Sequence, residues 1–322
     1  SPRPDRVGVL NDHRLHFGGH IEDSRDQISR QKWIAHPAVL DDQMFHHSIA
    51  DGLHDRADDL ALHQLRVDGV AHVIGADYTQ HMDQARFEID LDLLNRVSLP
   101  SGRQFQKLAD TTFRVTSLCR ADPRKVFRAA FGNDVLLYLR FRREVDRVSA
   151  SLRDFARDVF RPYRFLKQGV SWRFTKTTQE GLHVDYFRKD EDLHYVRIFI
   201  NVDQQPRVWT LSHSLEELIH RHYDEAGLGE VRHAPSNKVC SRLNKRVFDP
   251  MNKYAPGTMD RHFVHFAPGD VWLCETRLNS HEIYAGHRMV ATGFYVDPAS
   301  MLDPAERVDA RVQRALEAAG AA

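Results

Sequence analysis

The sequence is poor in cysteine and contains no long apolar run. Its three cysteines, Cys119, Cys240 and Cys274, are widely spaced and form no C-x-x-C pair, which predicts reduced thiols in a cytosolic protein. No apolar stretch reaches the roughly eighteen residues of a transmembrane helix, and the charged start lacks the apolar segment of a signal peptide. We therefore expect a cytoplasmic protein without a membrane span.

Lysine and glutamate are scarce in the first 98 residues. This segment has one Lys and two Glu against nine Arg, fifteen Asp and ten of the twenty His. No apolar period persists in it, although residues 67–74 could form a short strand. The composition is typical of GC-rich DNA translated upstream of a start codon, and a genuine disordered or metal-binding tail is the alternative. We predict a poorly ordered or non-native extension over 1–98 and a folded domain over 99–322.

The formal net charge of zero hides an asymmetry between these two parts. Residues 1–98 carry a net charge of −7, and residues 99–322 carry +7. A basic folded domain favours anionic ligands or an anionic lipid surface.

From Leu99 onward, the apolar patterns predict a mainly β domain with flanking helices. Strands are expected at 135–141, 170–175, 195–202, 207–210, 267–274 and 289–296. Helices are expected at 122–131 with Asp122 as N-cap, at 144–160, from the capping box Ser214–Glu217 to about Gly227, and at 303–318. The span 228–260 looks like a long irregular insertion.

His183 and Asp185 lie two positions apart just before the strand at 195–202. On an extended strand, side chains at i and i+2 point to the same face, so an imidazole and a carboxylate can converge on one ion. His281 follows the strand at 267–274 and is a third possible ligand. Two histidines and one carboxylate form the facial triad of non-haem Fe(II) oxygenases. An early strand pair with two ligands and a late pair with the third is the order of a double-stranded β-helix (jelly-roll, cupin-like).

His287 competes with His281 for the third position. At a period of two residues both side chains share one face, but Gly286 is expected to bend the chain between them. We prefer His281, because it follows the strand and turn. That choice leaves Arg288 downstream for the distal carboxylate of a 2-oxoglutarate cosubstrate, which a guanidinium binds through two parallel hydrogen bonds.

Other basic and aromatic residues are weaker candidates. Arg197 and Arg207 are the substitutes if Arg288 does not reach the cosubstrate. The tryptophans Trp172, Trp209 and Trp272 are expected in the core. Some of the remaining arginines and lysines could line a mouth for phosphate or carboxylate groups, although a basic surface is as good an interpretation for each: Arg140, Arg142, Arg143, Arg161, Arg164, Arg173 and Lys176.

Five segments together resemble the Kdo hydroxylases, bacterial Fe(II)/2-oxoglutarate dioxygenases that hydroxylate a 3-deoxy-D-manno-octulosonic acid (Kdo) sugar of the lipopolysaccharide inner core. The resemblance covers about residues 99–300, and its segments are Ser171–Thr175, Gly181–Asp185, Val196–Val202, Pro206–Trp209 and Ser280–Val290.

This resemblance implies a definite activity and ligand set. His183, Asp185 and His281 match the iron ligands, and 2-oxoglutarate and O2 are the cosubstrates. The substrate would be an anionic glycolipid, a Kdo-bearing lipid A precursor, reached by peripheral contact with the inner membrane and without nucleic acid. A dioxygenase for another small molecule or a protein side chain, and a metal-binding β-helix without turnover, are the alternatives. The oligomeric state and the hydroxylated carbon stay open.

Overall fold

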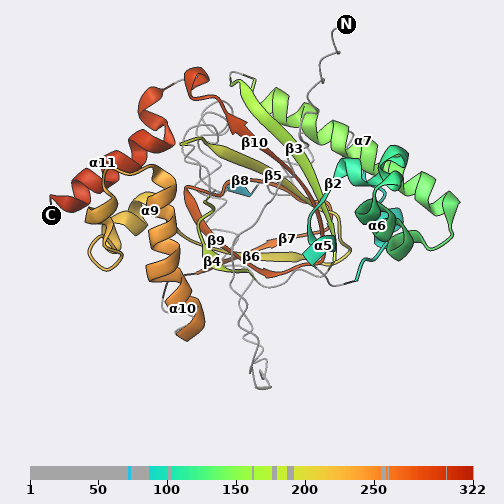
Figure 1. The fold of residues 1–322 in the computed structure, drawn as a ribbon, viewed down its shortest axis with the longest axis horizontal. Coiled ribbons are helices and arrows are strands. Elements are labelled where there is room, and N and C mark those ends of the chain that lie inside the picture. The colour runs from blue at the N-terminus through green and yellow to red at the C-terminus, as the bar shows by residue number, and fades with distance from the viewer. Residues whose placement is uncertain are drawn as a thin grey trace, which may run out of the picture. The chain divides into compact units, whose positions relative to one another are not determined.

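The computed structural model describes residues 72–73, 87–100, 103–161, 163–175, 180–186, 192–254, 259, 261–301 and 303–321. In this part of the chain, strands form two antiparallel sheets with helices beside them (Figure 1). The larger sheet has the order β1-β8-β5-β10-β3-β2 and the smaller one β4-β9-β6-β7. The strands are β1 (His72–Val73), β2 (Leu108–Ala109), β3 (Phe165–Phe174), β4 (Glu180–His183), β5 (Tyr195–Asn201), β6 (Arg207–Ser214), β7 (His262–Phe266), β8 (Val271–Glu275), β9 (Asn279–Ala285) and β10 (Arg288–Val296).

The strand order identifies the fold. From β3 to β10 the chain passes back and forth between the sheets, with β3, β5, β8 and β10 in one and β4, β6, β7 and β9 in the other. Two four-stranded antiparallel sheets connected in this way form a double-stranded β-helix, the jelly-roll architecture. The predicted fold class, mainly β with flanking helices, is confirmed.

The larger sheet is covered on both faces, which explains why its strands β5, β8 and β10 are rich in apolar residues. In β10, Met289 and Ala291 face the space between the sheets, where they pack with aromatic residues of both sheets. Their neighbours Val290 and Phe294 face the opposite side, toward the helices. This alternation follows the two-residue period of a strand.

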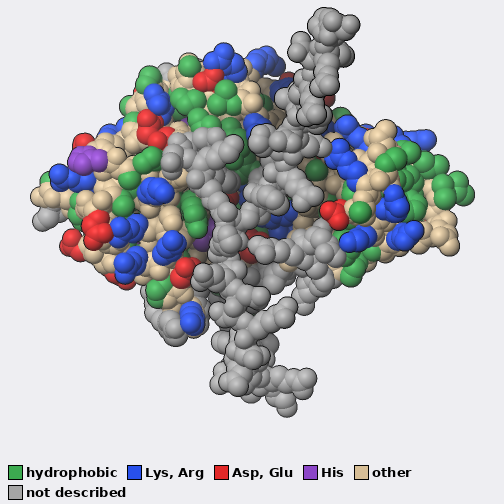
Figure 2. Space-filling view, in the orientation of Figure 1, with side chains coloured by type: hydrophobic (Ala, Val, Ile, Leu, Met, Phe, Trp, Pro, Cys, Tyr) green, Lys and Arg blue, Asp and Glu red, His purple; other side chains and the backbone are tan. Residues whose placement is uncertain are grey.

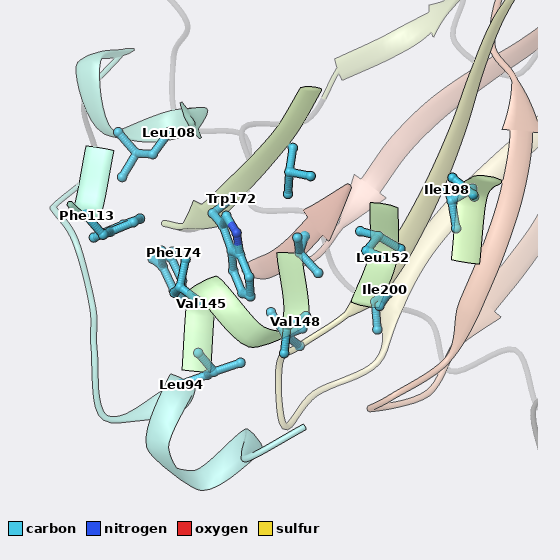
Figure 3. Close-up of a cluster of buried hydrophobic side chains, with 14 of the residues drawn as sticks. Leu94, Leu108, Phe113, Val145, Val148, Leu152, Trp172, Phe174, Ile198 and Ile200 are labelled. Carbon is cyan, nitrogen blue, oxygen red and sulfur yellow. The ribbon is translucent and has the colours of Figure 1, made fainter. Parts of the chain in front are cut away.

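The outer face of the larger sheet packs against the long helix α7 (Val135–Val159). Tyr138 and Phe141 continue the three- and four-residue spacing of Val145, Val148 and Leu152, so one apolar stripe runs along the helix and meets Trp172 and Ile200 of the sheet (Figure 3). The strand predicted at 135–141 is therefore wrong. The helix begins there because the Asp134 side chain accepts a hydrogen bond from the Leu137 N–H and caps its first turn.

Several short elements precede α7: α4 (Leu91–Asn95), α5 (Arg103–Gln106), the 3₁₀ turns η1 (Asp110–Phe113) and η2 (Val115–Cys119), and α6 (Ala121–Phe131). The predicted N-cap of α6 is one of the corrections. Arg120 occupies that position without a side-chain cap, and Asp122 lies inside the first turn. There a carboxylate still interacts favourably with the positive end of the helix dipole.

The domain boundary predicted between residues 98 and 99 is also corrected. Leu94 and Val97 are fully buried in the core that contains α7, and Phe87 and Ile89 pack against it. Residues 87–98 therefore belong to the folded domain. Helix α4 is too short to produce a recognisable period, which is why the sequence did not reveal it. The strand expected within 67–74 is confirmed at β1 (His72–Val73). Residues 1–71 and 74–86 of the predicted extension lie outside the described residues.

A second helical group packs around its own buried cluster: α8 (Leu215–Arg221), η3 (Leu228–Val231), α9 (Ser236–Leu243), the π-helix η4 (Asn244–Phe248), α10 (Asp249–Tyr254) and α11 (Val308–Gly320). The 3₁₀ turns η5 (Pro298–Ser300) and η6 (Pro304–Glu306) lie between β10 and α11. The capping box of Ser214 and Glu217 is confirmed, although α8 ends before Gly227. The prediction of an irregular segment over 228–260 is wrong for residues 228–254, which form helices, while 255–258 and 260 lie outside the described residues. Among the many polar residues of this segment, Val239, Leu243 and Val247 form part of a buried apolar cluster.

The C-terminal helix begins later than predicted, at Val308, and its predicted buried stripe of Val308, Val312 and Leu316 is confirmed. None of the helices in the described ranges is long and apolar enough to cross a membrane.

Candidate metal centre

Strands β4 and β9 bring three potential metal ligands together. The strands pair antiparallel with His183 directly opposite His281. Asp185 follows two residues later, where its backbone N–H donates to the Thr276 carbonyl at 2.8 Å. One ligand atom each of His183, Asp185 and His281 lies within 4.8 Å of the others. The structure thus brings the three predicted ligand residues into one cluster.

The backbone fixes the tautomer of both imidazoles. His183 Nδ1 lies 2.7 Å from the Gly181 carbonyl oxygen, and His281 Nδ1 lies 3.1 Å from that of Asn279. A carbonyl oxygen only accepts, so each Nδ1 carries the proton and donates it. In the neutral imidazole, Nε2 then keeps its lone pair, which is the form in which a histidine binds a metal.

The protonation states of the cluster favour a cation. Burial, together with the nearby His183, lowers the pKa of His281 to about 4, so its imidazole is neutral at physiological pH. Burial alone would raise the pKa of Asp185, but the nearby His183, His281 and Arg197 hold it well below its usual range. Against the effect of burial, Asp185 in turn raises the pKa of His183, so a metal ion at Nε2 would replace the proton that His183 shares with this carboxylate. A carboxylate beside a neutral imidazole suits a divalent ion.

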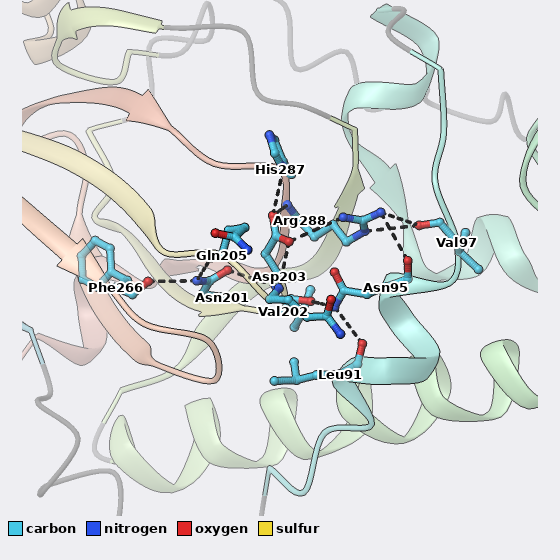
Figure 4. A network of polar contacts seen from close by, with 11 residues as sticks. Leu91, Asn95, Val97, Asn201, Val202, Asp203, Gln205, Phe266, His287 and Arg288 are labelled. Atoms are coloured by element: carbon cyan, nitrogen blue, oxygen red, sulfur yellow. Dashed lines mark hydrogen bonds and ion pairs between the residues drawn. The ribbon is translucent and has the colours of Figure 1, made fainter. Parts of the chain in front are cut away.

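His287 and Arg288 lie away from this cluster, in a separate polar network (Figure 4). His287 Nδ1 is 3.3 Å from an Asp203 carboxylate oxygen, so the structure favours His281 over its competitor. The Arg288 guanidinium donates to the Val97 carbonyl from Nε and Nη2 at 3.2 Å, and its Nη1 lies 3.5 Å from Asp203. Arg288 faces the outer side of β10 with Val290, so the cosubstrate role predicted for it is corrected.

A cavity between the two sheets opens beside the cluster. Its lining includes Asp185 and His281 together with three cations, Lys107, Arg173 and Arg197. The only acids in this lining, within the described ranges, are Asp185 and Glu180. The remaining wall is mostly apolar and aromatic: Trp172, Phe199, Trp209, Ile283 and Met289, with Ser171.

The two arginines in this lining, Arg173 and Arg197, have different partners. Arg197 Nη1 lies 3.5 Å from Asp185 Oδ2, and its guanidinium lies over the Phe199 ring at 4.5 Å. Arg173 lies 3.5 Å from Glu180 through Nη2, and its buried Nε has no hydrogen-bond partner among the described residues. Because Arg173 is almost fully buried, an anion in the cavity would satisfy this donor.

A third arginine increases the positive charge behind the cavity wall. Arg207 is fully buried, and burial together with the neighbouring charge of Arg173 lowers its pKa to about 9. Its guanidinium fits against Gly286, where a Cβ would come within 2.7 Å of Nη1. Gly286 has φ 145°, a conformation that favours glycine, so the bend predicted at this residue is confirmed and makes room for the arginine.

Asn244 holds the segment between the first two ligands. Its side-chain Oδ1 accepts from the Val184 N–H at 3.1 Å, and its Nδ2 donates to the Val184 carbonyl at 2.8 Å. The side-chain amide therefore makes the two backbone hydrogen bonds that a neighbouring strand would otherwise make, at the point where β4 has ended. Asn244 begins the π-helix η4, and such helices are frequent at functional sites. No sequence pattern pointed to this residue, because it lies in the span predicted to be irregular.

The three tryptophans named above are buried, as predicted. Two of them also line the cavity, and Trp209 stacks on His281 with ring centroids 5.3 Å apart. Among the arginines and lysines that were expected to line a binding-site mouth for anionic groups, Arg173 lines the cavity. Lys176 is outside the described residues.

No protein-family model and no curated protein sequence matches this chain. The similar solved structures include those of the Kdo hydroxylase KdoO, a non-heme Fe(II) alphaketoglutarate dependent dioxygenase. Its complex with alphaketoglutarate and Fe(III) has a TM-score of 0.48 and 14% identity over 71% of this chain and 81% of that one. Its apo structure has a TM-score of 0.49 and 13% identity over 82% and 93%. Likeness at this distance assigns no chemistry, so the function has to rest on this chain's own residues.

Proposed function

We propose that this chain is an Fe(II)- and 2-oxoglutarate-dependent dioxygenase that hydroxylates a Kdo sugar of a lipid A precursor. The observation that carries the proposal is the cluster of His183, Asp185 and His281 at a cavity with an excess of cations. The donor set, two imidazole nitrogens and one carboxylate, is the one that non-haem Fe(II) oxygenases use.

The residues of the cluster fit the metal. Fe(II) would be held by Nε2 of His183, Nε2 of His281 and the carboxylate of Asp185, since both Nδ1 atoms already donate to backbone carbonyls. When bound, the iron supplies the activation of O2 and coordination positions for a 2-oxo acid. Asn244 and the β9 partner strand keep the ligand side chains in place.

For 2-oxoglutarate, Arg173 is the best candidate to bind the distal carboxylate. It lines the cavity and is almost fully buried, and its Nε lacks a partner among the described residues. A guanidinium can meet a carboxylate through two parallel N–H···O bonds. Arg197 is the alternative, but it already lies beside Asp185.

The charge of the cavity selects an anionic substrate. Kdo carries a carboxylate, and the cavity lining offers Lys107 and Arg197 in addition to Arg173. The aromatic wall excludes water from the reacting C–H bond, which prevents loss of reactive species to solvent. The motifs from Ser171 to Val290 that resemble the Kdo hydroxylases are the reason to choose Kdo among anionic substrates.

The substrate is tested by mass spectrometry of a Kdo-bearing lipid A precursor after incubation with the protein, Fe(II), 2-oxoglutarate and O2. We expect the mass of the precursor to increase by one oxygen atom. No gain from iron-loaded protein, together with hydroxylation of an unrelated substrate, would reject Kdo and retain the dioxygenase chemistry.

The cosubstrate site is tested with Arg173→Gln. Loss of a charge-assisted hydrogen bond costs about 1.5–3 kcal/mol, so the KM for 2-oxoglutarate should rise about 10- to 100-fold. The matched control is Arg288→Gln, which should leave this KM unchanged. If Arg288→Gln raises this KM and Arg173→Gln does not, Arg288 binds the distal carboxylate. If only Arg197→Gln raises it, Arg197 does.

A further inference from the structure

The first turns of α7 expose aliphatic side chains that the core does not use. Leu136 is 74% exposed, Val135 57% and Leu139 45%, and Val115 of η2 is 50% exposed. The core-facing stripe of the same helix consists of other residues, among them Tyr138 and Phe141. Contiguous exposed apolar residues on a helix mark an interaction surface.

Positive charge surrounds these side chains. Arg140 and Arg143 lie one helical turn after Leu136 and Leu139 on the same exposed face of α7. Arg114 precedes Val115, and α6 adds the exposed Arg124, Lys125 and Arg128. Figure 2 shows hydrophobic and basic side chains gathered over α6 and α7.

Acidic residues are few in this part of the chain. From 114 to 143 it has eight Lys and Arg against two Asp and no Glu. The next acids along α7, Glu144 and Asp146, form ion pairs with Arg147 and Arg142 and leave Arg140 and Arg143 out of these pairs. We call the exposed surface formed by Val135, Leu136 and Leu139 with Arg140 and Arg143 of α7 the apolar-basic face. Nucleic acid would use the charges but leave the aliphatic side chains in water, whereas an anionic bilayer accepts both, with aliphatic groups among the acyl chains and guanidinium groups at the phosphates.

We propose that the apolar-basic face docks the protein peripherally on anionic lipid bilayers. Docking of this kind needs no spanning helix, because partial insertion of an amphipathic surface combines with attraction to anionic headgroups.

Docking is tested by co-sedimentation of the full chain with phosphatidylcholine vesicles that do or do not contain phosphatidylglycerol, at low and high salt. We expect binding only to the anionic vesicles, and weaker binding as salt rises. Leu136→Ser with Leu139→Ser should reduce the partition coefficient at least about tenfold. Arg140→Gln with Arg143→Gln should reduce it about fivefold per charge.

The matched control replaces an exposed leucine and two exposed cations elsewhere, Leu166→Ser with Arg221→Gln and Lys238→Gln. This variant should bind the vesicles like the native chain. Equal binding by the native chain and both face variants would overturn the proposal, and so would the absence of binding to anionic vesicles. Dimers that form through the face, detected by light scattering in place of vesicle binding, would also overturn it.

The same variants separate this proposal from the proposed function. None of the face residues lines the cavity, so succinate formation from 2-oxoglutarate without vesicles should be unchanged in every variant. Vesicle binding without any such turnover in the native chain would reject the dioxygenase and keep the docking surface.

Discussion

Replacing Asn244 with leucine should weaken metal binding far more than an equally costly substitution elsewhere in the fold. The leucine keeps the approximate volume of the side chain but removes both hydrogen bonds to Val184, which is fully buried. A buried polar group without a partner costs about 1–3 kcal/mol. The free energy of unfolding should therefore fall by about 2–6 kcal/mol.

The effect on metal binding follows from the position of Val184 between two ligands. If the segment shifts so that its N–H and C=O reach water, His183 and Asp185 shift with it. Loss of a group that orients metal ligands typically reduces affinity about 10- to 100-fold. We expect a decrease of this size in Co(II) affinity, measured by isothermal titration calorimetry on protein that is still folded.

Asn95→Leu is the matched control. The Asn95 amide donates to the carbonyls of Leu91 and Val202, away from the ligand cluster. Its replacement should lower stability in urea unfolding but leave Co(II) affinity unchanged. If Asn244→Leu binds Co(II) as tightly as the native chain at a similar loss of stability, Asn244 supports the fold and does not position the ligands.

Three further predictions follow from other parts of the structure. Leu94→Ala should lower the free energy of unfolding by about 2–5 kcal/mol, because Leu94 is fully buried; a change within error in urea unfolding would place residues 87–98 outside the core. Burial raises the pKa of the Cys240 thiol to about 11 and also raises the pKa of Cys274, so both stay protonated and unreactive at neutral pH. Iodoacetamide followed by mass spectrometry should then label only the exposed Cys119, and rapid labelling of all three would contradict this burial. Gly286→Ala should lower the melting temperature, because φ 145° strains any other residue and the new Cβ meets a buried guanidinium; an unchanged value would show that the bend tolerates a side chain.

The cluster of His183, Asp185 and His281 and the main strands could be predicted because their signals are local. The two-residue spacing of His183 and Asp185 on a strand dictates a shared face, and the apolar runs of β5, β8 and β10 require burial on both faces. The choice of His281 over His287 depended on its place after the strand and turn, and Gly286, with φ 145°, separates the two histidines.

The remaining features depend on tertiary contacts that leave no local pattern. The segment Val135–Phe141 has strand-like composition, and its helical state is set by the Asp134 cap and by packing on the larger sheet. Arg288 follows His281 closely in sequence, but alternation along β10 turns it to the outer face, toward Val97 and Asp203. Asn244 contacts Val184 across sixty residues, a distance that no sequence window spans.

We propose that His183, Asp185 and His281 hold an iron that supports turnover of 2-oxoglutarate. The most direct measurement is succinate formation from 2-oxoglutarate under O2 with added Fe(II), in the native chain and in His281→Ala and His287→Ala. Succinate should form with Fe(II), stop on addition of a chelator, be lost in His281→Ala and persist in His287→Ala. Turnover that survives in His281→Ala, or that is lost only in His287→Ala, would contradict the assignment of this metal centre.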